Sequence, residues 1–212
     1  NSIFLVIGIF AFFLILKKKL FKKKIKLILF VTSILFIGIL MHKTHDDFFY
    51  YHFQYTISLI EFKKIFGVGN LEHGWRTPSS IFYFNSLFYL PILEKSLINS
   101  GAIYFLIFSN IFLIQKVSNQ LKNKKFDFIL ILSLLSLLFI NTIFHRLAEH
   151  GTDRSALILI FILAIYLLEG INRKLSKINF KHYYKKILVT ILLIVSLKSF
   201  YLIYIIFIFI LF

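Results

Sequence analysis

Three adjacent residues, His45, Asp46 and Asp47, place an imidazole beside two carboxylates and could support acid–base chemistry. A carboxylate at such a position can act as a general base, or the pair can hold a divalent cation. The ordinary alternative is that Asp46 or Asp47 caps the N-terminus of the helix that follows. The two aspartates are therefore the candidate catalytic residues and, if the site uses a metal, its candidate ligands.

A glycine-rich run at residues 67–80 carries three candidate substrate-binding side chains, His73, Trp75 and Arg76. Its three glycines, one proline and small polar residues predict a tight, irregular loop. Trp75 could stack on a ring-shaped group, and Arg76 could form a bidentate bond with phosphate. The run matches neither a phosphate-binding P-loop nor a dinucleotide-binding fingerprint. The alternative is a surface turn with Trp75 in the aromatic belt of a membrane interface.

Residues 145–154 form a third polar cluster, with two histidines, two acids and two arginines. His145, Glu149 and His150 could ligate a metal, but their spacing matches no zinc-binding helix motif. Thr152 and Asp153 also fit the N-terminus of the apolar run that follows. Capping and a solvated loop are the alternative to a binding role for Asp153.

Lys198 interrupts the apolar residues 187–212. One straight helix would place this lysine near the middle of a bilayer, which costs about 2.5–3.5 kcal/mol. Two short helices with Lys198 at an outer turn avoid that cost, and charges at such breaks are candidates for function. The alternative is a lysine that extends to the lipid headgroups.

Apolar helices must position these candidates. The chain is 59% hydrophobic with a mean hydropathy of +0.85, which is far above a soluble domain. We predict an all-α fold, a polytopic helical membrane protein with about six to seven spans. The predicted spans are residues 2–16, 25–41, 102–117, 126–144 and 156–171, followed by the short runs 187–197 and 199–212.

Basic residues divide the two ends of these spans. Residues 17–26, 116–125 and 173–186 hold 17 of the 25 lysines and arginines, and alternating spans place all three segments on one side. The positive-inside rule makes that side cytoplasmic. Seven of the nine acids and six of the seven histidines then lie outside. The net charge of +16 is therefore a signal of topology and of lipid headgroups, and does not indicate nucleic-acid binding.

The outer segment 42–101 is predicted to contain interfacial helices. Residues 48–66 show helical periodicity with a wide apolar face, and residues 81–93 are too short to span and favour a re-entrant or interfacial helix. We interpret residues 1–212 as one transmembrane domain, cut at both ends. The absence of cysteine excludes disulfides and thiolate metal sites.

The order of these motifs resembles the GT-C superfamily of membrane glycosyltransferases, which use polyprenyl-phosphate-linked sugars. The likeness lies in an outer acid before an interfacial helix (His45-Asp46-Asp47), an outer aspartate opening an apolar span (Asp153), and a lysine between two short helices (Lys198). It covers residues 42–212. A closer likeness is to uncharacterised bacterial multi-pass membrane proteins with an outer Asp-Asp pair. Unlike the family pattern, at least one span precedes the helix before the aspartates.

The resemblance implies a glycosyltransferase on the outer face of a bacterial cytoplasmic membrane. Asp46 or Asp47 would be the general base or, with a divalent ion as a possible cofactor, a metal ligand. Arg76 and Lys198 would stabilise the lipid phosphate, and the remaining substrate-binding candidates are His45, His73, Trp75 and Asp153. The implied partners are membrane lipid and the polyprenyl-phosphate-linked sugar, without nucleic acid. The alternatives are a lipid-linked glycan flippase or other transporter, and a non-catalytic assembly subunit.

Overall fold

The described part of the chain is helical, which confirms the predicted all-α class. The computed structural model describes residues 6–8, 10, 11, 14, 19–40, 47–62, 67–76, 79–90, 97, 98, 100–143, 152–172 and 177–209, and within them there is no β-strand. The elements are α2 (Lys19–Leu40), η1 (Phe48–His52), α3 (Phe53–Glu61), η2 (Val68–Asn70), η3 (His73–Trp75), α4 (Ser80–Ser86), α5 (Ser100–Lys122), α6 (Phe128–Ile143), α8 (Thr152–Asn172), α9 (Lys177–Leu197) and η4 (Ser199–Ile208).

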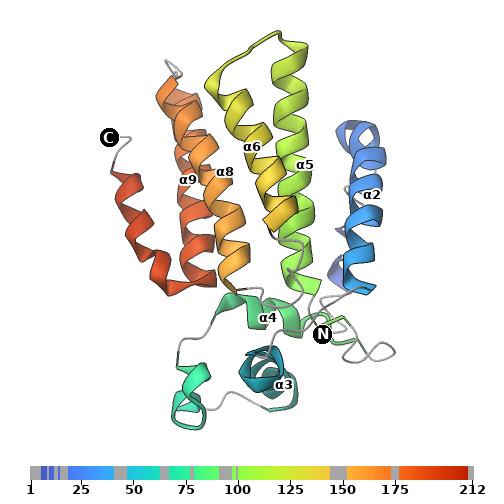
Figure 1. The fold of residues 1–212 in the computed structure, drawn as a ribbon, viewed down its shortest axis with the longest axis vertical. Helices are drawn as coiled ribbons and strands as arrows, with labels where there is room; N and C mark the ends of the chain where they lie inside the picture. The colour runs from blue at the N-terminus through green and yellow to red at the C-terminus, as the bar shows by residue number, and fades with distance from the viewer. Residues whose placement is uncertain are drawn as a thin grey trace.

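The long helices stand side by side, and the short helices α3 and α4 lie across one end of them (Figure 1). Helices α8 and α9 are antiparallel, because Asp153 at the start of α8 contacts Lys198 after α9, while Glu169 near the end of α8 contacts Tyr183. Buried residues of α4, α8 and α9 share one apolar cluster with Tyr55 of α3. The short helices are thus packed onto the bundle.

In the part of the chain that the structure describes, two helices, Ser100–Lys122 and Thr152–Ile171, are long and apolar enough to cross a membrane. Two shorter apolar helices cover Phe128–Thr142 and Ser199–Ile208. Core helices of soluble proteins share this length and composition. The six to seven spans therefore remain a prediction.

The helices differ from their predicted ranges mainly at their ends. Helices α5, α8 and α9 begin or end in polar residues beyond the apolar runs, because backbone hydrogen bonding continues into flanks that hydropathy alone does not count. The predicted helix at 48–66 is two pieces, a π-helical turn η1 followed by α3, which ends where Phe62 adopts an extended conformation. In the run 81–93, α4 ends at Ser86 and residues 87–90 are not helical, while residues 91–93 lie outside the described part of the chain.

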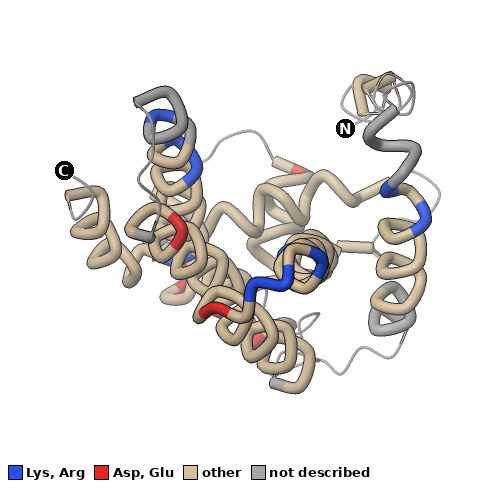
Figure 2. The backbone as a smooth tube through the Cα atoms, turned by 90° about the horizontal axis from the view of Figure 1, so that it is seen from above, with Lys and Arg blue, Asp and Glu red and all other residues tan. Residues whose placement is uncertain are grey.

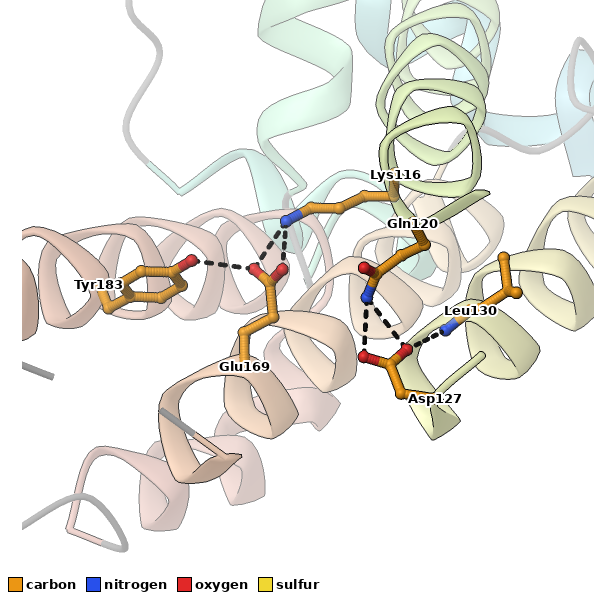
Figure 3. Close-up of polar contacts among 6 residues, drawn as sticks. All are labelled: Lys116, Gln120, Asp127, Leu130, Glu169 and Tyr183. Carbon is orange, nitrogen blue, oxygen red and sulfur yellow. Dashed lines mark hydrogen bonds and ion pairs between the residues drawn. The ribbon is translucent and has the colours of Figure 1, made fainter. Parts of the chain in front are cut away.

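The start of α2 and the connection between α5 and α6 lie at the end of the bundle opposite α3 and α4 (Figure 1), and both carry basic residues (Figure 2). A buried ion pair joins α5 and α8 toward the same end. The Lys116 ammonium lies 2.6 Å from both carboxylate oxygens of Glu169, and the Tyr183 hydroxyl donates to the same carboxylate at 3.2 Å (Figure 3). Nearby, Gln120 donates to Asp127, which also accepts from the Leu130 amide. Both acids of this end are therefore hydrogen-bonded.

A close approach of α4 and α5 depends on Gly101. Its amide donates to the Asn85 side-chain oxygen at 3.0 Å, and a Cβ added at residue 101 would overlap Asn85 and lie 2.9 Å from Phe84. We expect Gly101→Ala to lower the free energy of unfolding by about 1–3 kcal/mol, because α4 must move away from the bundle. Thermal unfolding of the purified protein tests this. Gly8→Ala is the control, since no atom lies within 4 Å of that position, and equal melting temperatures for the two variants would contradict the expectation.

Candidate functional site

A pocket of about 100 Å³ lies where the short helices meet the end of the bundle. Its lining comes from η1, from Gly74 in η3 and from the start of α4. The start of α8 and the break between α9 and η4 complete it. The lining residues are Asp47, Tyr51, His52, Gly74, Ser79, Phe82, Thr152, Asp153, Leu197, Lys198 and Ser199. Two carboxylates, one ammonium, a phenol, an imidazole and three hydroxyls therefore face a single small space.

Lys198 lies at a helix break, as predicted. Helix α9 ends at Leu197, Lys198 is extended (φ −149°, ψ 112°), and η4 begins at Ser199. The Lys198 ammonium lies 2.8 Å from Oδ1 of Asp153, which is in the first turn of α8. Both side chains are about half exposed, so this ion pair contributes little stability. Its main effect is to place a positive charge at the pocket wall.

Ser79 connects α4 to the helix end beside Lys198. Its hydroxyl caps α4 by accepting from the Ile81 amide, and it donates to the Leu197 carbonyl at 2.5 Å. The last carbonyls of a helix have no partner within the helix, so this bond satisfies one of them. A second contact, Ser80 to Ser196 at 3.0 Å, supports the same joint. The position of Lys198 is thus tied to α4 as well as to α9.

Asp47 does not cap the helix that follows it. It occupies the residue before η1, but its side chain makes no capping hydrogen bond. Its carboxylate instead accepts a hydrogen bond from the Tyr51 hydroxyl, four residues later. Burial, together with the negative charges of Asp47 and then Asp153, raises the pKa of Tyr51 above its usual value. Tyr51 therefore stays protonated at neutral pH and acts as a donor.

The structure places the sequence-predicted candidates in three groups. Asp47, Asp153 and Lys198 line the pocket together. His73, Trp75 and Arg76 do not line it. His45 and Asp46 lie outside the described residues, as do His145, Glu149 and His150.

In the segment 67–76, the contacts of Trp75 and Arg76 are with other residues of the chain. His73 is exposed, and Arg76 is exposed and donates through Nε to the Gly69 carbonyl at 3.3 Å. The Trp75 indole donates to the Tyr51 carbonyl at 3.2 Å and packs against the Tyr55 ring at 5.6 Å. These contacts support the backbone of η1 and α3.

Tyr51 and His52 are pocket residues that the sequence patterns did not single out. His52 is buried and its ring contacts Tyr51 and Phe82, at centroid distances of 4.3 and 5.1 Å. The available signal was spacing, because residues four apart share one face of a helix and Tyr51 follows Asp47 by that interval. Because Tyr51 stands in a run of aromatic residues, its position is equally consistent with the apolar face of a helix, so the four-residue interval from Asp47 did not single it out.

The described residues do not supply the set of ligands that a divalent cation requires. Nowhere in this part of the chain do three histidine or acidic side chains gather as a metal site would require. Asp153, one of the two pocket carboxylates, already contacts the Lys198 ammonium. Metal binding through Asp46 and Asp47 stays a prediction.

The pocket can combine two chemical tasks. The Asp47 carboxylate can accept a proton from a hydroxyl. Lys198, with the hydroxyls of Thr152 and Ser199 that line the same pocket, can bind an anionic group such as phosphate. A base and an anion-binding cation in one pocket suit group transfer from a phosphate leaving group.

Comparison with known proteins relates the whole chain to one family. Residues 1–212 match a family described as "Domain of unknown function (DUF8201)". No curated protein and no solved structure matches the chain.

Proposed function

We propose that this chain, which belongs to the DUF8201 family, is a membrane glycosyltransferase that uses a sugar linked to polyprenyl phosphate. The acceptor would be a hydroxyl group at the outer surface of a bacterial cytoplasmic membrane. The observation that carries the proposal is the pocket in which Asp47 and Asp153 meet Lys198 at one end of an apolar helix bundle.

The exterior of the bundle supports a membrane location. Large apolar side chains are exposed on the flanks of α5, α6 and α9, among them Phe108, Leu135, Leu138, Phe139, Val189 and Leu192. An apolar surface of this kind suits contact with lipid chains. With two helices long enough to span, and shorter apolar ones beside them, we infer a multi-pass protein.

Charge gives the proposed orientation. The lysines of α2 and of the α5–α6 connection lie at the end of the bundle remote from the pocket, where Lys24 donates to Gln115 at 2.9 Å. If that basic end is cytoplasmic, the pocket lies on the other side of the membrane. There it can receive a lipid-linked sugar from the bilayer and an acceptor from outside.

The proposed reaction forms one carbon–oxygen bond, breaks another, and transfers one proton. The acceptor oxygen bonds to the anomeric carbon while Asp47 takes the hydroxyl proton. The bond from that carbon to the phosphate oxygen breaks, and its electron pair leaves with the polyprenyl phosphate. Lys198 stabilises the negative charge of the leaving phosphate, and attack from the opposite side inverts the anomeric centre.

A transfer assay in liposomes tests the proposal. Purified protein is reconstituted with a panel of polyprenyl-phosphate-linked hexoses and a hydroxyl acceptor, and released polyprenyl phosphate is measured with the glycosylated product. A glycosyltransferase yields both in equal amounts. Movement of the lipid-linked sugar across the bilayer without release would indicate the flippase, and neither process with any donor would indicate a non-catalytic subunit.

Lys198→Met is expected to weaken binding of polyprenyl phosphate about ten- to hundredfold, because a charged hydrogen bond to phosphate is lost. Binding of a short-chain polyprenyl phosphate in detergent can be measured by calorimetry. Lys181→Met is the matched control, since Lys181 is exposed on α9 and does not line the pocket. Unchanged affinity in Lys198→Met would remove Lys198 from the phosphate site.

A further inference from the structure

Tyr51 is held by more contacts than its place in an aromatic run requires. Its backbone carbonyl accepts from the Trp75 indole at 3.2 Å. Its ring lies 4.3 Å from the buried His52 ring, nearly perpendicular to it. Its hydroxyl donates to Asp47 in the pocket. The backbone, ring and hydroxyl of one residue are thus each restrained.

Gly74 provides the strongest restraint. A Cβ added at residue 74 would lie 2.5 Å from Cγ and 2.9 Å from Cβ of Tyr51. Rotation of the tyrosine side chain cannot move its Cβ, so any side chain at 74 would displace η1 or the segment 67–76. Among the described residues the only glycine with a positive φ is Gly67. Glycine at 74 is therefore explained by packing against Tyr51 and not by backbone conformation.

The Tyr51 hydroxyl lies in a strongly charged setting. Asp47 and Asp153 both act on it, and Lys198 lines the same pocket. Because the phenol remains protonated, it offers Asp47 one directed hydrogen bond. A carboxylate without such a partner can rotate about its terminal bond, whereas a bonded one presents its other lone pairs in a defined direction.

We infer that Tyr51 is a positioning residue: its hydroxyl orients the Asp47 carboxylate toward the pocket, and Gly74 and Trp75 hold Tyr51 in place. This rests on the proposed function, in which Asp47 is the general base. It gives the glycine-rich segment 67–76 a supporting role beneath the site in place of direct substrate contact.

The kinetic test uses Tyr51→Phe, which keeps the ring and its packing on Gly74 and removes only the hydroxyl. We expect kcat for sugar transfer to fall about tenfold or more, with KM for the lipid-linked donor changed less than about threefold. Gly74→Ala is expected to lower kcat in the same way by displacing the tyrosine. Tyr50→Phe is the matched control, because Tyr50 is 72% exposed and does not line the pocket.

A spectroscopic test does not depend on transfer activity. The tyrosinate absorbance of Tyr51 is isolated by subtracting the alkaline titration of Tyr51→Phe from that of the unaltered protein. The subtraction is repeated on an Asp47→Asn background. We expect the asparagine to lower the pKa of Tyr51, because a negative charge and a hydrogen-bond acceptor are both lost. Asp153→Asn should shift it in the same direction by less.

The two tests separate the possible failures. If the unaltered protein transfers no sugar but Asp47→Asn still shifts the Tyr51 titration, the Tyr51–Asp47 bond stands and the proposed function fails. An active protein whose Tyr51→Phe variant keeps the full kcat overturns the inference. If the pKa of Tyr51 is the same with Asp47 and with asparagine at that position, the inference is overturned as well, whether or not the protein is active.

Discussion

Asp47→Asn is expected to reduce the rate of sugar transfer by about 10²- to 10⁴-fold, the range over which a general base contributes to catalysis. Asparagine keeps the size of the side chain but cannot take a proton from the acceptor hydroxyl. The measurement is the initial rate of polyprenyl phosphate release in reconstituted liposomes. Binding of polyprenyl phosphate alone should change little, since Lys198 and not Asp47 is assigned to that group.

The matched control is Glu61→Gln. Glu61 is the last residue of α3, it is exposed, and it does not line the pocket. The same change from acid to amide at that position should leave the rate close to that of the unaltered protein. Asp46→Asn is measured alongside, because the base was predicted from the pair. If neither aspartate variant slows transfer, Asp47 is not the base and the enzymatic proposal loses its main support.

Lys116→Met is expected to lower the free energy of unfolding by about 3–5 kcal/mol, because it removes an ammonium that contacts a buried carboxylate. Glu169 is only 3% exposed, and both of its oxygens lie 2.6 Å from the Lys116 ammonium. After the substitution only the Tyr183 hydroxyl among the contacts in Figure 3 would still reach that carboxylate. Denaturation of the detergent-solubilised protein, followed by helical circular dichroism, measures the change.

Two further variants distinguish the effect on stability of losing the ion pair from the effect of losing a lysine side chain. Lys122→Met makes the same substitution at an exposed position of α5 and should change stability by less than about 0.5 kcal/mol. The double variant Lys116→Met, Glu169→Gln should recover much of the lost stability, because the carboxylate charge is removed together with the lysine. A double variant no more stable than Lys116→Met alone would show that the lysine acts through its packing over Phe112.

The helices were the most predictable part of this protein. Runs of apolar residues long enough for α5 and α8 are visible in the sequence, and hydropathy requires no knowledge of their neighbours. Their ends were less predictable, since polar residues such as Lys122 and Asn172 continue the backbone hydrogen bonding. The break before η4 was predictable because a charged residue in an apolar run disfavours one straight helix.

The candidate site was predictable in part. Asp47 was singled out as one of a carboxylate pair, Asp153 as an aspartate that opens an apolar run, and Lys198 as a charge within one. The structure brings these three to one pocket. Arg76 and His73 were chosen for their residue types as well, yet both are exposed and neither lines the pocket. Residue type alone does not distinguish a polar side chain that points into a pocket from one that points to solvent.

By itself the sequence determined that the chain is helical, that its basic residues gather at one end of the helices, and that Lys198 separates two of them. These properties depend on local composition and periodicity, which each segment carries alone. Only the tertiary structure decided that Asp153 contacts Lys198, and that Gly74 and Trp75 pack against Tyr51. Such contacts join segments far apart in the chain, and they depend on how the helices pack, which no local pattern specifies.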